Sequence, residues 1–150
     1  MRLDELKVII TGGAKGMGRH FAMRLAESGA TVAVGDVDRE ALADLPAGIH
    51  RRPLDVCDEA ECIEFVHWAH ETMGGLNALV NNAGIIRDGL LVKKRRDDGA
   101  IQKMALDTFE SVIDVNLIGA TLMVREVVAQ MLSTDTAGVI VTRLRGPYRS

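Results

Sequence analysis

Near its start the chain reads Lys7-Val8-Ile9-Ile10-Thr11-Gly12-Gly13-Ala14-Lys15-Gly16-Met17-Gly18, an apolar run that leads directly into a glycine-rich turn. The apolar run is typical of a buried strand, and the residues after the turn have the pattern of a helix. Glycine lets the backbone turn tightly and approach a pyrophosphate, and the N-terminus of the following helix presents free N–H groups to that anion. The spacing Gly-x3-Gly-x-Gly therefore predicts a dinucleotide-binding turn, although glycine-rich turns also serve purely structural ends.

Three further apolar runs end in residues suited to a nucleotide site. The first, Thr31 to Asp36, ends in an acid where the ribose hydroxyls of the adenosine half are expected. The second ends at Asp55, which is followed by Val56, and the third runs into Asn81-Asn82-Ala83-Gly84. With the turn, these segments form an ordered series of motifs along the chain.

Together with Ile113-Asp114-Val115-Asn116, these motifs resemble the short-chain dehydrogenase/reductase family from about Leu6 to Val141. The run Asn81 to Leu91 resembles its 3-oxoacyl-carrier-protein reductase-like branch. The resemblance implies NAD(P)-dependent hydride transfer between an alcohol and a carbonyl of a small-molecule substrate. It also implies these cofactor-binding residues: Thr11, Gly12, Lys15, Gly16, Met17, Gly18, Asp36, Asp55, Val56, Asn82, Ala83 and Gly84.

Two side chains near the turn give opposite indications about the cofactor. The Asp36 carboxylate can accept hydrogen bonds from both ribose hydroxyls of NAD and would repel the 2′-phosphate of NADP. Lys15 stands where NADP-preferring members of the resembled family often carry a basic residue, and it could pair with that phosphate. We expect NAD, because the repulsion from Asp36 acts directly at the hydroxyl site, whereas a flexible lysine can turn to solvent. Asp36 could also serve as a helix N-cap ahead of Arg39.

The other implied site residues have structural alternatives. By resemblance, Asp55 reaches the exocyclic amine of adenine and Val56 covers the ring, but these residues could equally end a strand and lead into a helix. The segment Asn82 to Gly84 is implied to pass close to the cofactor ribose. In the family, the residue matching Asn116 distorts its helix and holds a water that relays protons to a Lys–Tyr pair. Alternatively, Asn116 hydrogen-bonds its own backbone.

Apolar runs alternate with helical patterns, which is the signature of a parallel sheet covered on both faces. We therefore predict the α/β class, as an incomplete Rossmann-like three-layer sandwich with a parallel sheet of about five strands. The expected strands are Val8–Thr11, Thr31–Gly35, Ile49–Leu54, Ala78–Asn81 and Gly138–Val141.

Other patterns predict the helix ends and one loop. Gly29 predicts a left-handed cap after the first helix, and Asp58 and Asp107 predict helix starts, each with a glutamate three positions on. From Arg87 to Gln102 a mixed-charge run predicts a solvated surface loop. A substrate-side flap and a basic docking patch are the functional alternatives for this segment.

Composition limits the remaining function classes. The 150 residues are 47% hydrophobic with a formal net charge of −3, which predicts one domain with a core and argues against general nucleic-acid affinity. The apolar runs are too short to span a bilayer and the first residues lack a signal-peptide core, so we expect a cytoplasmic protein without a membrane partner. Cys57, Cys62, His67 and His70 match no common zinc spacing, so no metal site is predicted.

The family's catalytic serine and its Tyr-x3-Lys pair have no match in this sequence, which leaves Asn116 as the remnant of a catalytic tetrad. After Val141 an arginine-rich stretch follows, and neither Tyr148 nor Ser150 stands at a matching position. We therefore divide the chain into a dinucleotide-binding domain at 1–141 and a basic tail at 142–150. We expect a C-terminally truncated, inactive relative that self-associates through the Asn116 helix; the alternatives are a non-catalytic dinucleotide-binding module and a pseudogene product.

Overall fold

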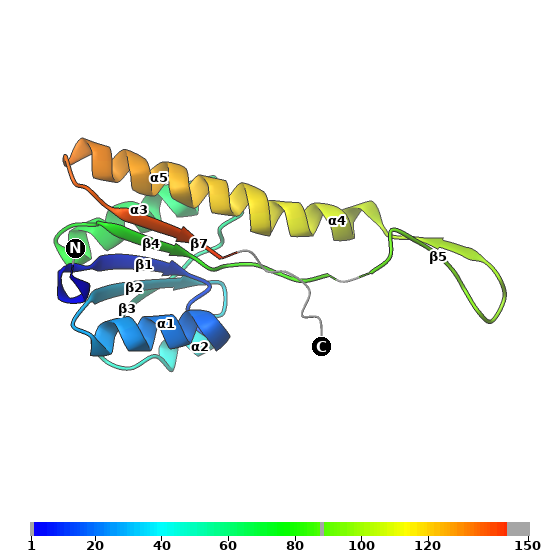
Figure 1. Cartoon of the computed structure of the whole chain (residues 1–150), viewed down its shortest axis with the longest axis horizontal. Helices are drawn as coiled ribbons and strands as arrows, with labels where there is room; N and C mark the ends of the chain where they lie inside the picture. Colours follow the sequence, from blue (N-terminus) through cyan, green and yellow to red (C-terminus); the bar gives the residue numbers. More distant parts are fainter. Residues whose placement is uncertain (1, 88, 144–150) are drawn as a thin grey trace.

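A five-stranded parallel sheet forms the centre of the molecule (Figure 1). The computed structural model describes residues 2–87 and 89–143. The strand order is β3-β2-β1-β4-β7, and every neighbouring pair is parallel, so the predicted α/β class is confirmed. The strands are β1 (Lys7–Thr11), β2 (Thr31–Asp36), β3 (His50–Pro53), β4 (Ala78–Asn81) and β7 (Val139–Thr142).

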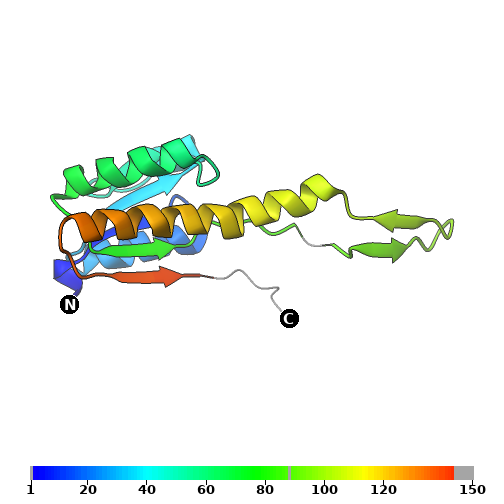
Figure 2. The ribbon, with the colours of Figure 1, turned by 90° about the horizontal axis from the view of Figure 1, so that it is seen from above.

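Helices cover both faces of this sheet and complete the three layers (Figure 2). After a short 3-10 turn (η1, Leu3–Glu5), α1 (Gly16–Glu27) and α2 (Arg39–Ala43) lie on one face, and α3 (Glu59–Met73) and α5 (Ala120–Ser133) on the other. Successive side chains of a strand point to opposite faces, so the continuous apolar runs supply both cores. In β1, Val8 and Ile10 pack on the α1 side, whereas Ile9 packs on the α3 side.

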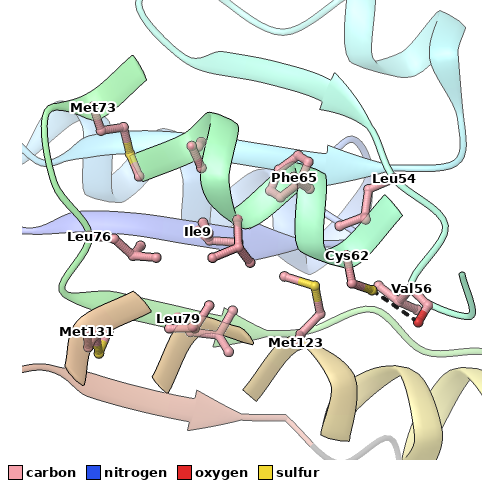
Figure 3. Close-up of a cluster of buried hydrophobic side chains, with 14 residues drawn as sticks. Ile9, Leu54, Val56, Cys62, Phe65, Met73, Leu76, Leu79, Met123 and Met131 are labelled. Atoms are coloured by element: carbon pink, nitrogen blue, oxygen red, sulfur yellow. Dashed lines mark hydrogen bonds between the residues drawn. The ribbon is translucent and has the colours of Figure 1, made fainter. Parts of the chain in front are cut away.

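The larger of the two cores joins α3 and α5 over the sheet (Figure 3). Phe65 of α3, Leu79 of β4 and Met123 of α5 are almost completely buried there. Burying one large apolar side chain contributes about 1.5–3 kcal/mol, so this cluster fixes both helices relative to the strands. At its edge the Cys62 thiol donates a hydrogen bond to the Val56 carbonyl oxygen at 3.4 Å, which ties α3 to the segment that follows β3.

The last helical segment is one long helix with an irregular centre. It runs through α4 (Leu106–Ile113), a π-helical turn (η2, Asp114–Gly119) and α5, and its α4 end extends beyond the sheet (Figure 1). A π-helical turn inserts an extra residue into the helical ladder and often marks a functional site. Asn116 lies within this turn, at the place where the resemblance predicts a distortion.

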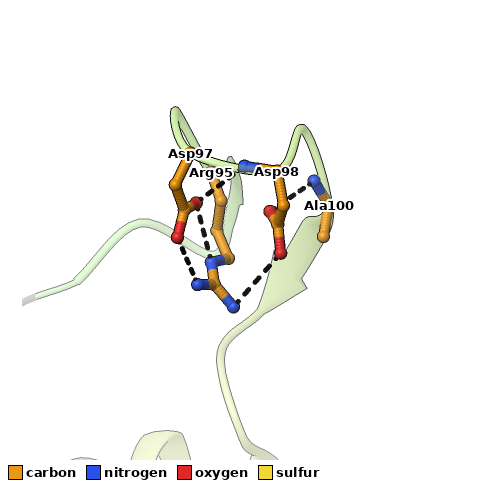
Figure 4. Close-up of polar contacts among 4 residues, drawn as sticks. All are labelled: Arg95, Asp97, Asp98 and Ala100. Carbon is orange, nitrogen blue, oxygen red and sulfur yellow. Dashed lines mark hydrogen bonds and ion pairs between the residues drawn. The ribbon is translucent and has the colours of Figure 1, made fainter.

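The segment predicted as a surface loop contains a β-hairpin instead. Strands β5 (Val92–Lys94) and β6 (Ile101–Lys103) pair antiparallel, and all six of their residues are exposed. The turn is closed by Arg95, whose guanidinium contacts Asp97 Oδ2 at 2.5 Å and Asp98 Oδ2 at 3.5 Å (Figure 4). Gly99 follows with a φ of 71°, so the Asp98-Gly99 pair was a hairpin signal that the charge pattern concealed.

The predicted helix ends are partly correct. Gly29 has a φ of 91°, as a left-handed position after α1 requires, and Asp58 Oδ1 accepts from the Glu61 N–H at 3.0 Å. The Glu61 carboxylate, however, accepts from the Asp55 N–H at 2.7 Å rather than closing a capping box. The expected cap at Asp107 is wrong: α4 begins after Ala105, and Asp107 lies inside its first turn, where its charge still favours the helix dipole.

Candidate nucleotide-binding cleft

A cleft of about 400 Å³ lies at the carboxyl ends of β1, β2, β3 and β4, the edge at which doubly wound sheets bind their ligands. It brings together eight of the twelve residues predicted to bind a cofactor: Gly12, Lys15, Gly16, Asp36, Asp55, Val56, Ala83 and Gly84. Sequence reasoning missed five further lining residues: Val37, Asp38, Leu54, Ile85 and Val115. Each of the five lies within two positions of a predicted residue, so proximity in sequence was the available signal.

The glycine turn has the backbone shape of an anion cradle. Gly12 and Gly16 have φ values of 62° and 54°, which L side chains rarely adopt. Gly16 lines the cleft, and a Cβ there would meet no atom within 4 Å, so the turn has open space at this residue. At Gly18, by contrast, a Cβ would come within 2.2 Å of the Gly12 carbonyl oxygen, so α1 can pack against the turn only with glycine there. These residues therefore fit a pyrophosphate at the start of α1.

Thr11 and Asn82 hold the glycine turn by hydrogen bonds and do not line the cleft. The buried Thr11 hydroxyl oxygen accepts hydrogen bonds from the N–H groups of Asn82 and Ala83, at 3.1 and 3.0 Å. Asn82 Nδ2 donates to the carbonyl oxygens of Thr11 and Gly12, at 3.1 and 2.9 Å. The geometry gives them a positioning role between β1 and β4, while Met17 is 44% exposed and also lies outside the lining.

The Asp36 carboxylate is held by two backbone groups at the mouth of the cleft. Oδ2 accepts from the Ala14 N–H at 3.0 Å, and Oδ1 accepts from the Asp38 N–H at 3.1 Å. Each carboxylate oxygen has a further lone pair, so both can still accept from ligand hydroxyls. The alternative role of Asp36 as a helix N-cap is wrong, because Asp38 caps α2 by accepting from the Ala41 N–H at 2.9 Å.

The Lys15 side chain is 71% exposed, as the sequence led us to expect, but its ammonium is paired. Its Nζ lies 2.5 Å from Asp38 Oδ2, across the mouth of the cleft. The hydrogen bond and charge of Asp38 raise the pKa of Lys15. The same hydrogen bond lowers the pKa of Asp38, so the two groups form an ion pair over the whole neutral range.

Another part of the lining is formed by the segment after β3, with Asp55 and Val56, and by Val115 of η2. Val56 is only 6% exposed and offers an apolar surface, and a Cβ on Gly119 would come within 2.7 Å of its Cγ2. Asp55 Oδ1 accepts from the Cys57 N–H at 2.9 Å. Burial, and then the charge of Asp55, raises the pKa of Cys57 to about 11, so this thiol is protonated at neutral pH. This part of the lining thus combines an apolar patch with a carboxylate.

The Asn116 amide bonds a neighbouring segment and not its own backbone. Its Oδ1 accepts from the Ile85 N–H at 2.8 Å, and its Nδ2 donates to the Ile85 carbonyl oxygen at 2.9 Å. This pair of bonds fastens the π-helical turn to the chain leaving β4. A small cavity of about 80 Å³ lies beside it, lined by Asn81, Ala83, Gly84, Asn116, Ala120, Thr142 and Arg143.

Other predictions concern residues outside this cleft. Within residues 2–87 and 89–143, no cluster of three or more His, Cys, Asp or Glu could hold a metal ion. Over the same residues, no helix combines the length and apolar character needed to cross a membrane. Tyr148, Ser150 and the arginines at 145 and 149 lie outside the described residues.

Comparison with known proteins agrees with this geometry. A family model described as short chain dehydrogenase matches residues 6–143, and the chain belongs to that family. The chain is 33% identical to the 3-oxoacyl-[acyl-carrier-protein] reductase FabG of Thermotoga maritima, over 99% of this chain and 59% of the relative. It is 34% identical to a 3-alpha-(or 20-beta)-hydroxysteroid dehydrogenase of Mycobacterium tuberculosis, over 93% of this chain and 51% of that protein.

The likeness extends to three dimensions. The crystal structure of gox2181 superimposes with a TM-score of 0.77 and 29% identity, over 94% of this chain and 54% of that one. The resemblance predicted from the motifs is therefore confirmed at the level of family and fold. The chain spans about half the length of the curated relatives that it matches.

Proposed function

We propose that this chain binds NAD in the cleft at the carboxyl ends of the strands, as the dinucleotide-binding part of a short-chain oxidoreductase. Family membership implies a nicotinamide dinucleotide cofactor. The observation that carries the proposal is that the glycine turn, with open space at Gly16, and the Asp36 carboxylate bonded to it line the same cleft. A dinucleotide needs this combination of an anion cradle and a hydroxyl acceptor.

Each part of the cleft has a role in this proposal. The turn from Gly12 to Gly16 and the start of α1 would hold the pyrophosphate, and Asp36 the adenosine ribose. Asp55 and Val56 would frame the adenine, and the backbone at Ala83 would approach the other ribose. The bound cofactor would supply the hydride acceptor for oxidation of an alcohol or the hydride donor for reduction of a carbonyl.

The charge of the cleft supports NAD over NADP. The lining of the described cleft contains three carboxylates, Asp36, Asp38 and Asp55, and one cation, Lys15. A 2′-phosphate carries roughly two negative charges and would enter a region that is already net negative. The two hydroxyls of NAD instead donate hydrogen bonds to Asp36, whose two oxygens are fixed by backbone groups.

Turnover is proposed to need groups that this sequence does not contain. Its 150 residues include one tyrosine, Tyr148, and no Tyr-x3-Lys pair to move the hydroxyl proton of an alcohol or carbonyl substrate. A positioned proton donor typically contributes about 10²–10⁴-fold in rate. Asn116 holds the Ile85 backbone and cannot replace that donor. We therefore propose dinucleotide binding without catalysis for this polypeptide alone.

Calorimetric titration of the chain with NAD and with NADP tests the proposal. We expect measurable binding of NAD and weaker binding of NADP. Asp36→Ala should reduce the difference in affinity between NAD and NADP. Asp44→Ala, which removes an exposed acid outside the cleft lining, should leave that difference unchanged. Tighter binding of NADP by the unmodified chain would show that Lys15 outweighs Asp36.

A turnover assay tests the second half of the proposal. Purified chain is incubated with NADH and a 3-oxoacyl thioester, or with NAD and simple alcohols. No steady change in NADH absorbance is expected. Steady turnover that Gly16→Val abolishes would overturn the assignment of this chain as non-catalytic.

A further inference from the structure

The Asp38 carboxylate divides its two oxygens between two tasks. Oδ1 accepts from the Ala41 N–H at 2.9 Å and caps α2, while Oδ2 lies 2.5 Å from Lys15 Nζ. The cap fixes where the carboxylate stands, because Oδ1 is bound to the helix backbone. The second oxygen therefore presents a fixed negative charge to the lysine. Both residues line the cleft.

Lys15 is the one cation among the described residues that line the cleft. A 2′-phosphate on the adenosine ribose would lie near Asp36 and would need this ammonium as its counter-charge. In the observed arrangement the ammonium already contacts Asp38. An incoming phosphate would therefore have to share the ammonium with Asp38 or displace that carboxylate, while it faces the charges of both Asp36 and Asp38.

We propose that Asp38 is a specificity-determining residue, which disfavours NADP by holding the Lys15 ammonium away from a 2′-phosphate. The inference rests on the proposed dinucleotide function and adds to it a second carboxylate with an indirect role. Asp36 acts at the hydroxyl site itself, whereas Asp38 acts through Lys15. Because Asp38 engages Lys15, this lysine does not give the cleft a preference for NADP.

The Lys15–Asp38 pair is exposed to solvent, so other groups can exchange with it. The side chains of Lys15 and Asp38 are 71% and 35% exposed, and ion pairs in contact with solvent are weak. Each group shifts the pKa of the other toward its charged form. Removing the charge of Asp38 should therefore free a fully protonated lysine at the mouth of the cleft.

Asp38→Asn separates the two tasks of this residue. Asparagine is as good an N-cap as aspartate, so its Oδ1 keeps the bond from the Ala41 N–H. Its amide has no charge with which to hold Lys15. We expect Asp38→Asn to tighten NADP binding by about tenfold or more relative to NAD, as one new charge-assisted contact to phosphate would give. An unchanged thermal melt would show that the cap survives.

The double variant Lys15→Ala/Asp38→Asn tests whether Asp38 lowers the NADP affinity through Lys15 or by its own charge. If Asp38 acts by holding Lys15, the gain in NADP affinity disappears when the lysine is absent. If Asp38 acts only by its own repulsion, the gain persists, and the inference is overturned. The matched control is Glu27→Gln, which breaks the exposed Arg24–Glu27 ion pair of 2.8 Å on α1 and should change neither affinity.

The same titrations separate this inference from the proposed function. Failure of the unmodified chain to bind NAD overturns the proposed function, and this inference with it. Binding of NAD together with equal NADP affinity in the unmodified and Asp38→Asn chains overturns the inference alone. A lysine-dependent gain of NADP affinity in Asp38→Asn supports both.

Discussion

Gly16 combines a left-handed backbone with open space on the side where a Cβ would stand. Gly48 shares both properties, with a φ of 95° and no atom within 4 Å, but it does not line the cleft. Replacing either residue by alanine places a side chain in the left-handed region and costs about 1–2 kcal/mol of stability. Gly16→Ala should in addition weaken NAD binding, because its methyl group occupies the cradle.

Urea unfolding and calorimetric titration of Gly16→Ala and Gly48→Ala measure the two effects. Equal losses of stability with a loss of NAD affinity confined to Gly16→Ala are expected. Equal NAD affinities would mean that the pyrophosphate does not approach the turn at this residue.

The two thiols make a prediction about pH. Partial desolvation and the neighbouring Asp55 carboxylate raise the pKa of the surface thiol Cys57 to about 11, and burial raises the pKa of Cys62 to about 12, from an ordinary value of 9.0. At pH 9.0 an unfolded thiol is half ionised, whereas a thiol with a pKa of about 11 is ionised about 50-fold less. Iodoacetamide should therefore modify the folded chain far more slowly than the urea-unfolded chain at this pH.

The raised thiol pKa values also predict how stability changes with pH. Because the folded pKa values are raised, the stability that these thiols confer is fully present below pH 9.0 and is lost as the pH rises toward 11 and 12. Cys57→Ser identifies the faster-reacting site, since Cys57 is exposed and Cys62 is buried. Rapid alkylation of folded Cys57 at pH 9.0 would contradict the raised pKa.

At the scale of elements, the β5–β6 hairpin forms a two-stranded sheet of its own, apart from the five-stranded sheet. All six strand residues are exposed, and an isolated two-stranded hairpin is marginal in water. Replacing residues 92–103 by a short Gly-Ser linker should therefore change the free energy of unfolding by less than about 1 kcal/mol. Urea denaturation of the shortened chain measures this, and a loss of several times that value would show that the hairpin supports the sheet.

Patterns within short stretches of sequence predicted the strands and the glycine turn, which depend mainly on neighbouring residues. Alternation and apolar runs located the five sheet strands, and the glycine spacing located the turn, because β1 and α1 are adjacent in sequence. The hairpin was missed, since the charges of Lys93 to Asp98 outweighed the Asp98-Gly99 turn signal. Within that run, Arg95 pairs with Asp97 and Asp98 inside the turn itself.

Long-range pairings could not be predicted in the same way. The Asn116 amide meets the backbone of Ile85, 31 positions earlier, and Lys15 meets Asp38, 23 positions later. Either polar side chain could have turned to solvent or bonded its own backbone, and only the packed positions of β4, η2 and α2 decide between these choices. The candidate site was thus located from sequence, but its charge pairing was not.

At the scale of the whole molecule, strand β7 and the long helix are among the elements that expose apolar side chains. Strand β7 forms an edge of the sheet, and its Val139 and Val141 are 44% and 52% exposed. On the long helix, Leu117 and Leu132 are 56% and 76% exposed. Parallel sheets are normally covered on both faces and at their edges, so such surface favours association with another copy of the chain.

The long helix that carries Asn116 is our proposed self-association surface, and a matched pair of variants tests it. Ile118 on this helix and Ile63 on α3 are both 47% exposed, so Ile118→Glu and Ile63→Glu place the same charge at equally accessible positions. Burying an unpaired carboxylate between two copies is strongly unfavourable, whereas the same group facing water is tolerated. Size-exclusion chromatography with light scattering should therefore show an oligomer for the unmodified chain and for Ile63→Glu, and a shift toward monomer for Ile118→Glu. If the unmodified chain is a monodisperse monomer with a sharp cooperative melt, its apolar helix face is compatible with water and the self-association proposal fails. If both variants shift equally, association uses α3 as well, and the assignment of the contact to the Asn116 helix is wrong.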